Sequence, residues 1–392
     1  MNLEPGTILV VDDNKINRMM LMHNLEQQGH TVSLAVDGQQ ALDQLKAKTY
    51  DLVLLDIEMP GMDGYQVLST LKQDVQFRHI PIIMVTAVDE VASAIRCIEM
   101  GAEDYLSKPF DPVLLRARIN ACLEKKRLRD KEQLYLKSLE REMEIGREIQ
   151  AGFLPAELPK SPGWEISASF KAAREVAGDF YDAFLLPDDS LVFAIGDVCG
   201  KGVGAALFMA LCRSLIRATI TSGIFNRKED THSLLHGERL HHVVSFTNNY
   251  IAETHGEANM FATVFIGIVD NHDGSLVYIN CGHEPPFLLG KDGTLSSLSG
   301  NGPALGIIPD AEYAVKNISM GDGSLLLAFT DGIPDALNEE ELCFGKDRLL
   351  EILRGWNGST DGLLGTIEKT LQKFIGTADK FDDVTLMAIK RV

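Results

Sequence analysis

The stretch VLLDIEMPGMDG, residues 53–64, decides the fold of the first part of this 392-residue chain. Its apolar run, 53–55, leads directly into a carboxylate, Asp56, and a turn built on Pro60 and Gly61 follows. Strands that are apolar throughout are typical of parallel sheets buried on both faces. Such sheets bind their ligands at the carboxyl ends of the strands. The stretch therefore predicts a buried strand with Asp56 at a binding site.

Four more apolar stretches of strand length occur within the first 120 residues, at 7–12, 31–36, 81–87 and 105–109. Segments with helical apolar spacing separate them, and Gly29 is expected to end the first helix. Five strands that alternate with helices predict a doubly wound α/β domain, flavodoxin-like, with a parallel sheet of five strands.

Polar side chains stand at the ends of several of these strands. The first strand ends in Asp12 and Asp13, the fourth carries Thr86, and the fifth ends in Lys108. Clustered carboxylates repel one another unless a cation neutralises them, and Mg²⁺ prefers such oxygen ligands. Asp56 could then attack a phosphoryl group, with Lys108 and the Thr86 hydroxyl holding its oxygens. The alternative is a flavodoxin-like sheet whose strand-end aspartates are only caps.

The motifs VVDDN, LLDIEMPGMDG, MVTA and LSKPF, in this order and spacing, resemble a response-regulator receiver domain over about residues 6–122. The resemblance implies that Asp56 is the phosphoacceptor and that a sensor histidine kinase is a partner. It implies a switch pair, Thr86 and Tyr105, beside Lys108. It also implies a Mg²⁺ site in which Asp12 assists and the ligands are Asp13, Asp56 and the backbone carbonyl of Glu58. The Glu58 side chain beside this site is expected to weaken phosphorylation or to alter metal affinity.

The composition changes between residues 123 and 149, where there is no proline and a single glycine. Apolar residues fall near a three-four spacing, which predicts one long helix. This helix is either one strand of a coiled coil, giving a homodimer, or a single solvated helix, and the short heptads leave both open. The predicted domains are 1–122, a helical linker at 123–154, and 155–392.

After Pro155 the chain is rich in strand-like stretches, many of which end in aspartate or glycine. Asp-Gly pairs at 273–274 and 292–293 predict hairpin turns. The segment 203–253 is mostly helical in pattern. Five histidines lie in it or just after it, and we expect them on a surface helix face: 232, 236, 241, 242 and 255. Strands at both ends with helices between them predict an α+β domain with antiparallel sheets.

A second set of carboxylates stands at the ends of these apolar runs, mostly beside small residues. It comprises Asp179, Asp197, Asp331 and the pair Asp382-Asp383. Carboxylates gathered in this way need metal, and two divalent ions close together can hold and activate a water molecule. Glycines beside them let backbone and metal-bound water approach closely.

The ordered series EIQAGFLP, AGDFYD, GDVCGKGVGAAL, CGHEPPFLL, GPALGI, FTDGIPDA and FDDVT resembles the bacterial PPM (type 2C) serine/threonine phosphatases of partner-switching stress and sporulation signalling, over about residues 145–391. The resemblance implies a four-layer α/β sandwich and two Mn²⁺ or Mg²⁺ ions that activate a water. Asp197 would bridge both ions, Asp179 and the Val198 carbonyl would hold one, and Asp331 and Asp382 the other. Asp382 is preferred to its neighbour because the family pattern places the ligand first.

The same resemblance implies the substrate, a phosphorylated anti-sigma-factor antagonist with a STAS fold, and a regulatory role for EIQAGFLP. Three positions depart from the family pattern, Ala177, Cys281 and Glu284, but none removes a metal ligand. No arginine is obvious as the group that captures substrate phosphate. The rival hypothesis is a non-catalytic adaptor that binds a sigma factor or its regulator, although an adaptor could lose these aspartates and this chain keeps them.

Charge and composition exclude several other functions. A net charge of −19 argues against nucleic acid or anionic lipid as a partner. The sequence has no basic C-terminal domain and no helix-turn-helix pattern, which argues against a DNA-binding regulator. It has no nucleotide-binding glycine motif, which argues against a kinase. The six cysteines lack CxxC spacing, no signal segment is visible, and no apolar stretch is expected to reach the ~18 residues of a membrane span. We therefore expect a cytoplasmic protein.

Overall fold

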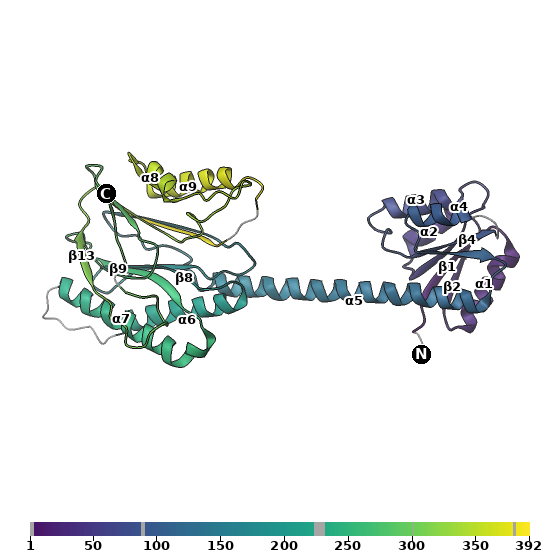
Figure 1. Cartoon of the computed structure of the whole chain (residues 1–392), viewed down its shortest axis with the longest axis horizontal. Coiled ribbons are helices and arrows are strands. Elements are labelled where there is room, and N and C mark those ends of the chain that lie inside the picture. Colours follow the sequence, from purple (N-terminus) through teal and green to yellow (C-terminus); the bar gives the residue numbers. More distant parts are fainter. Residues whose placement is uncertain (1–3, 88–90, 223–231, 301, 379–381) are drawn as a thin grey trace. The chain divides into compact units, whose positions relative to one another are not determined.

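The computed structural model describes residues 4–87, 91–222, 232–300, 302–378 and 382–392. The chain forms two compact units, Met1–Leu139 and Glu140–Val392, which are described separately (Figure 1).

The first unit is built on a parallel sheet of five strands in the order β2-β1-β3-β4-β5. Its strands are β1 (Thr7–Val11), β2 (Thr31–Ala35), β3 (Leu52–Asp56), β4 (Ile82–Ala87) and β5 (Asp104–Lys108). Every residue of β3 is buried, as its continuous apolar run predicts. The predicted doubly wound sheet is confirmed.

Helices cover both faces of this sheet (Figure 1). They are α1 (Lys15–Gln27), α2 (Gly38–Ala47), α3 (Gly64–Gln73), α4 (Val91–Glu99) and α5 (Pro112–Ala151). One core contains residues of α2, α3 and α4, and the other contains residues of α1 and the beginning of α5. Local chemistry sets the helix starts: Asn14 caps α1, and Asp63 and Gln66 form a capping box at α3.

Helix α5 is continuous over 40 residues. Its first turns bury Leu115 and Ile119 against the sheet, and most side chains beyond residue 123 are exposed. The boundary that the sequence pattern places between residues 122 and 123 therefore lies inside a helix, because nothing in this stretch breaks helical hydrogen bonding.

The second unit contains two antiparallel sheets of five strands. One has the order β13-β10-β9-β8-β7, with β7 (Phe180–Leu185), β8 (Leu191–Val198), β9 (Ala262–Val269), β10 (Ser275–Cys281) and β13 (Lys316–Ser319). The other has the order β12-β11-β14-β15-β6, with β6 (Trp164–Lys171), β11 (Phe287–Leu289), β12 (Leu295–Ser297), β14 (Leu325–Phe329) and β15 (Val384–Arg391). The Asp-Gly pairs lie in the β9–β10 and β11–β12 turns, as predicted.

The two sheets pack face to face, and helices cover their outer faces (Figure 1). Phe193, Phe265 and Met387 belong to the core between the sheets. The outer face of the first sheet packs on α6 (Val203–Ile220) and α7 (His232–His255), which continues into the short η2 (Gly256–Ala258). The outer face of the second sheet packs on α8 (Lys346–Leu353) and α9 (Thr360–Ile375). The predicted four-layer sandwich is confirmed.

Two expectations for the α6–α7 region were wrong. Helix α6 is long and apolar enough to cross a membrane by length and composition, but Met209, Cys212 and Ile216 lie in the domain core, as in a core helix. His236 of α7 is buried rather than on a surface face, with its Nε2 3.2 Å from the Ser190 hydroxyl. A helix packed on a sheet buries whichever residues face it, and His236 has a polar partner there.

Candidate functional site

The first unit gathers carboxylates where β1 and β3 end. These strands are neighbours in the sheet, so their carboxyl ends meet. Oxygen atoms of Asp12, Asp13 and Asp56 all lie within 4.8 Å of one another. Asp12 and Asp56 are buried and Asp13 is exposed, which leaves the group open on one side.

Lys108, at the end of β5, reaches into this group. Its Nζ lies 2.7 Å from Asp56 Oδ2 and 3.0 Å from Asp12 Oδ2. Burial raises the pKa of Asp56 to about 6, with Asp12 and Asp13 adding to the rise and Lys108 opposing it. One ammonium therefore compensates three carboxylates only in part, and the all-oxygen donor set suits Mg²⁺.

A cleft of about 780 Å³ opens over this group. Glu58 and Thr86 line it together with Asp13, Asp56 and Lys108. Tyr105, the other half of the predicted switch pair, is not part of the lining: it is 36% exposed, and its ring centroid lies 5.2 Å from the Arg118 guanidinium.

The cleft also contains residues that the sequence analysis missed. Arg96 of α4 lies in its wall with the guanidinium 4.2 Å from the centroid of the Tyr65 ring. Asn17 lines the cleft and donates a hydrogen bond from Nδ2 to Asp12. Neither carries a strand-end signal, because both lie on helices that the fold brings to this edge.

In the second unit, the predicted carboxylates come from both sheets and meet at one end of the sandwich. Asp179 directly precedes β7 and Asp197 lies near the end of β8, while Asp331 follows β14 and Asp382 precedes β15. Two hydroxyls join the sheets at this end: Thr330, directly after β14, and Thr385, in β15, each donate to Asp179 Oδ2, at 2.7 and 2.6 Å. Asp179 is thereby held in a buried position.

Close backbone approach also builds this end. A Cβ at Gly178 would lie 2.8 Å from the Val198 carbonyl oxygen, and one at Gly332 would collide with the Asp383 carbonyl. Glycine is therefore required at both positions. Gly332 brings the loop that carries Asp331 against residues 382–383.

Burial and neighbouring charges raise the pKa values of two of these acids. Burial raises the pKa of Asp197 to about 7, and the charges of Asp331, Asp382 and Asp383 add to the rise against a hydrogen bond with Asp179. Burial, Asp382, Asp335 and Glu284 likewise raise the pKa of Asp331. Such an acidic set of oxygen donors fits hard divalent cations. Among the described residues of this unit, however, no three acidic, histidine or cysteine ligand atoms come as close together as those of the first unit.

The neighbouring acids Asp382 and Asp383 have different surroundings. Asp383 is buried, and its two oxygens accept hydrogen bonds at 2.8 Å from the backbone N–H groups of Ala173 and Gly178. These two hydrogen bonds hold the loop between β6 and β7 at both Ala173 and Gly178. Asp382 instead faces Lys201, whose Nζ lies 2.9 Å from its Oδ2.

His283 supports the end of β8 and was also missed. It is buried, and its Nδ1 lies 2.9 Å from the hydroxyl of Thr263, which is 3.5 Å from the Asp197 carbonyl. Burial lowers the pKa of His283 to about 4, so the ring is neutral. The next residue, Glu284, forms an ion pair with Lys346 at 2.5 Å.

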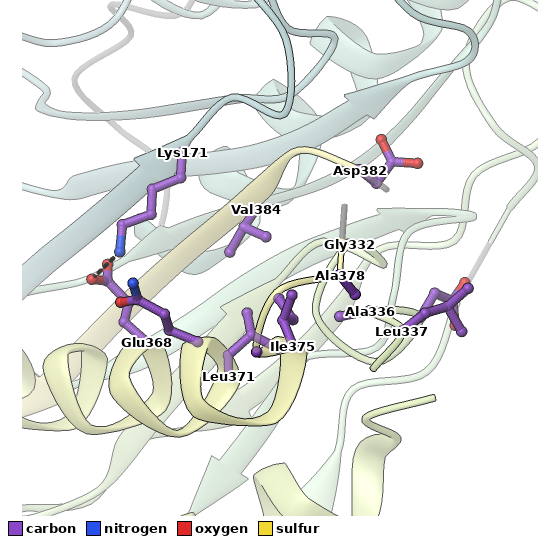
Figure 2. A pocket seen from close by; sticks show the side chains of 13 residues that line it. Lys171, Gly332, Ala336, Leu337, Glu368, Leu371, Ile375, Ala378, Asp382 and Val384 are labelled. Carbon is purple, nitrogen blue, oxygen red and sulfur yellow. Dashed lines mark hydrogen bonds and ion pairs between the residues drawn. The ribbon is translucent and has the colours of Figure 1, made fainter. Parts of the chain in front are cut away.

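An apolar pocket of about 250 Å³ lies beside the carboxylates, between α9 and the loop after β14 (Figure 2). Leu371, Ile375 and Val384 line it, and the ion pair between Lys171 and Glu368, at 2.6 Å, closes one side. Asp382 stands at its edge with the carboxylate pointing away from the apolar lining in Figure 2. The pocket therefore adjoins the carboxylate set at Asp382.

Comparisons with known proteins agree with both units. The response regulator receiver domain pattern matches residues 8–120, and the stage II sporulation protein E (SpoIIE) pattern matches residues 187–392. Protein IcfG of Synechocystis sp. is 40% identical over 269 residues, which are 64% of this chain and 41% of that protein. Response regulator PleD of Caulobacter vibrioides is 44% identical over 114 residues, 29% of this chain and 25% of that protein. The chain thus spans less than half the length of either relative.

The SiaA-PP2C domain of Pseudomonas aeruginosa is similar in structure, with a TM-score of 0.54 and 20% identity over 65% of this chain and 98% of that domain. At this identity the likeness shows the fold alone. The SpoIIE match covers more than half of the chain and includes Asp197, Asp331 and Asp382. The chain belongs to the stage II sporulation protein E family, with a PP2C-type phosphatase domain that follows a response-regulator receiver domain.

Proposed function

We propose that this protein is a response regulator whose receiver controls a metal-dependent protein serine/threonine phosphatase. The observation that carries the proposal is the convergence of Asp179, Asp197, Asp331 and Asp382 from two sheets at one end of the sandwich. Burial, together with the charges of neighbouring acids, raises the pKa of Asp197 and Asp331, and groups with pKa values shifted in this way cluster at functional sites.

In the receiver, Asp56 is the phosphoacceptor. Lys108 holds its carboxylate and would hold the phosphoryl oxygens after transfer. Mg²⁺ would be bound by Asp13, Asp56 and the Glu58 carbonyl, with Asp12 assisting. Thr86 lines the cleft while Tyr105 lies outside it, so the proposed switch requires Tyr105 to change its position when Thr86 engages the phosphoryl group.

In the phosphatase domain, Asp197 would bridge two Mn²⁺ or Mg²⁺ ions. Asp179 and the Val198 carbonyl would hold one ion, and Asp331 and Asp382 the other. When bound, the ions supply an activated water and stabilise charge on the phosphoryl group. The Thr330 and Thr385 hydroxyls orient Asp179 for this task. Asp383 acts on the backbone and is not proposed as a ligand.

The connection between the domains is the helical linker, proposed as residues 123–154 between domains at 1–122 and 155–392. Helix α5 exposes a row of large apolar side chains, among them Leu128, Tyr135, Leu139 and Ile149. Exposed apolar side chains at near-heptad spacing favour a paired helix, so we propose a homodimer through this segment. Phosphorylation would act by changing that pairing.

The proposed partners rest on the resemblance to the two families. A sensor histidine kinase would supply the phosphate of Asp56, and a phosphorylated anti-sigma-factor antagonist with a STAS fold would be the substrate, in the cytoplasm. A surface of net charge −19 offers no attraction to nucleic acid or anionic lipid, which supports a protein substrate.

The decisive experiment measures Mn²⁺-dependent phosphate release from a generic phosphoester by the full chain, with and without beryllofluoride on the receiver. Activity that is lost in Asp197→Ala and changed by beryllofluoride is expected. Activity that beryllofluoride does not change would support the phosphatase assignment but contradict its regulation by the receiver. No metal-dependent activity on phosphoester or phosphoprotein would replace the enzyme with an adaptor that binds a sigma-factor regulator.

A further inference from the structure

Substrate phosphate faces an electrostatic problem at the phosphatase carboxylates. A phosphomonoester is an anion, and the end of the sandwich presents Asp197, Asp331 and Asp382 to it. Bound cations offset part of this charge, but a protein cation beside the site would also attract the anion and fix its orientation. The question is which basic side chain of this chain is placed for that role.

We propose that Lys201 is the phosphate-capturing residue of the phosphatase domain, an inference that rests on the function proposed above. Lys201 lies on the loop between β8, which carries Asp197, and α6. Its Nζ is 2.9 Å from Asp382 Oδ2, so the ammonium lies at the carboxylate set itself. Its side chain is 30% exposed, so part of it is in contact with solvent.

The loop holds Lys201 in a defined position. Gly200 and Gly202 on either side have φ angles of +90° and +80°, a backbone region that other residues rarely adopt. The Lys201 backbone is thus placed by a turn that glycine makes possible, while its long side chain can still rotate. Rotation is sufficient to move the ammonium from one anionic partner to another.

Two other lysines near this end pair with acids that are not proposed as metal ligands. Lys346 pairs with Glu284 at 2.5 Å and is 46% exposed. Lys171 pairs with Glu368 at one side of the apolar pocket, and Asp382 lies at the other side (Figure 2). Arg174 is exposed in the loop between β6 and β7 and is the main rival for phosphate.

The pairing with Asp382 suggests an exchange. Without a divalent ion, the ammonium neutralises Asp382; when an ion binds this carboxylate, the attraction between Asp382 and the ammonium is weakened. A phosphate anion placed at the ions then becomes the strongest nearby acceptor for the ammonium. The exchange couples metal loading to phosphate capture and needs no movement of the backbone.

The test uses the full chain loaded with Mn²⁺, with p-nitrophenyl phosphate as substrate and inorganic phosphate as inhibitor. Losing one charge-assisted contact in Lys201→Met is expected to raise both the KM and the phosphate inhibition constant about tenfold, with a smaller change in kcat. Lys201→Arg keeps the charge and is expected to stay within about threefold of wild type. Lys171→Met, a matched removal of a lysine whose partner is Glu368, is expected to change neither constant.

Mn²⁺ affinity, measured by electron paramagnetic resonance, separates capture from ligand positioning. It should be unchanged or higher in Lys201→Met, because a competing cation is gone. The proposal would be overturned if Lys201→Met bound phosphate as tightly as wild type or lost its Mn²⁺ binding. It would also be overturned if Arg174→Met, and not Lys201→Met, weakened phosphate binding. If wild type shows no turnover, calorimetric titration of phosphate into the Mn²⁺-loaded wild type and Lys201→Met decides the inference separately from the function, and absence of phosphate binding to wild type overturns it.

Discussion

The side chain of Gln150 forms two hydrogen bonds with the backbone of Ala177. Its Nε2 donates to the Ala177 carbonyl at 2.6 Å, and its Oε1 accepts from the Ala177 N–H at 3.0 Å. Both residues are buried. Gln150 lies in the last turn of α5, and Ala177 stands two residues before Asp179. The end of the linker helix is thus bonded directly to the loop that carries a proposed metal ligand.

Replacing Gln150 with alanine should therefore weaken metal binding. The change leaves two buried backbone groups without partners, at a cost of about 1–3 kcal/mol each, and frees the loop that positions Asp179. We expect a lower Mn²⁺ affinity and a lower activity at limiting Mn²⁺, with partial recovery at saturating Mn²⁺, in a metal titration of phosphoester hydrolysis.

Glu148→Ala is the matched control, since Glu148 is exposed on the same turn of the helix. It should titrate like wild type. Equal Mn²⁺ affinities in Gln150→Ala and wild type would show that the loop needs no support from α5.

The adjacent acids Asp382 and Asp383 should give different defects when each is replaced by alanine: loss of activity for one and loss of stability for the other. Asp383→Ala removes the acceptor of the Ala173 and Gly178 N–H groups and should lower the free energy of unfolding by about 1–3 kcal/mol or more. Asp382→Ala removes a carboxylate that raises the pKa of Asp197 and Asp331, so the metal-free protein should keep its stability while Mn²⁺-dependent activity is lost.

Denaturant unfolding without metal and Mn²⁺-dependent hydrolysis separate the two cases. If only Asp382→Ala lost stability, or if that variant bound Mn²⁺ normally, Asp382 would not be the metal ligand of the pair.

Much of the fold was predictable because its signals are local. Continuous apolar strands with polar ends identified the parallel sheet, and the Asp-Gly pairs identified two hairpin turns. The same strand-end signal selected Asp12, Asp56 and Asp197 as candidate site residues from the sequence alone. Where a ligand lies at the end of a buried strand, sequence position and spatial position coincide.

The remaining features depend on contacts between distant segments. Nothing near Asp383 in the sequence shows that its oxygens will accept from Ala173 and Gly178, which lie far earlier in the chain. His236 has a surface-like neighbourhood in sequence, yet the packing of α7 buries it beside Ser190. Lys201 stands in a motif of the family, GDVCGKG, but only the fold places its ammonium at Asp382.

Helix α5 should mediate self-association if its exposed apolar row is a pairing surface. Tyr135 is 68% exposed and Leu139 is 39% exposed, and they lie one turn apart on one side of the helix. We expect the wild-type chain to have about twice its monomer mass of 43.1 kDa in light scattering. The double variant Tyr135→Glu, Leu139→Glu should be a monomer, because like charges would face each other across the pair.

Ser138→Glu adds a charge to another exposed position of the same helix and should leave the dimer intact. A wild-type chain that is monomeric at all accessible concentrations, or a double variant that still dimerises, would exclude pairing through this row.

The raised pKa of Asp197 predicts how the metal-free phosphatase domain responds to pH. A carboxyl whose pKa rises from 3.8 to about 7 on folding stabilises the fold fully below pH 3.8 and loses that contribution as the pH rises through 7. Both tryptophans, Trp164 and Trp356, lie in this domain, so tryptophan fluorescence follows its unfolding within the full chain. In the absence of metal, the denaturant concentration at the unfolding midpoint should therefore decrease as the pH is raised from 5 to 8.

Asp197→Asn cannot ionise, so its midpoint should fall less over this range and should exceed that of wild type at pH 8. The fall will not vanish, because Asp331 also has a raised pKa. Mn²⁺ at pH 8 should raise the midpoint of wild type and leave that of Asp197→Asn nearly unchanged. Asp347→Asn, an exposed acid at the start of α8, is the control and should follow wild type. If the unfolding midpoints of Asp197→Asn and wild type changed in parallel with pH, the pKa of Asp197 would not be raised by folding. The electrostatic argument for a metal site there would then fail.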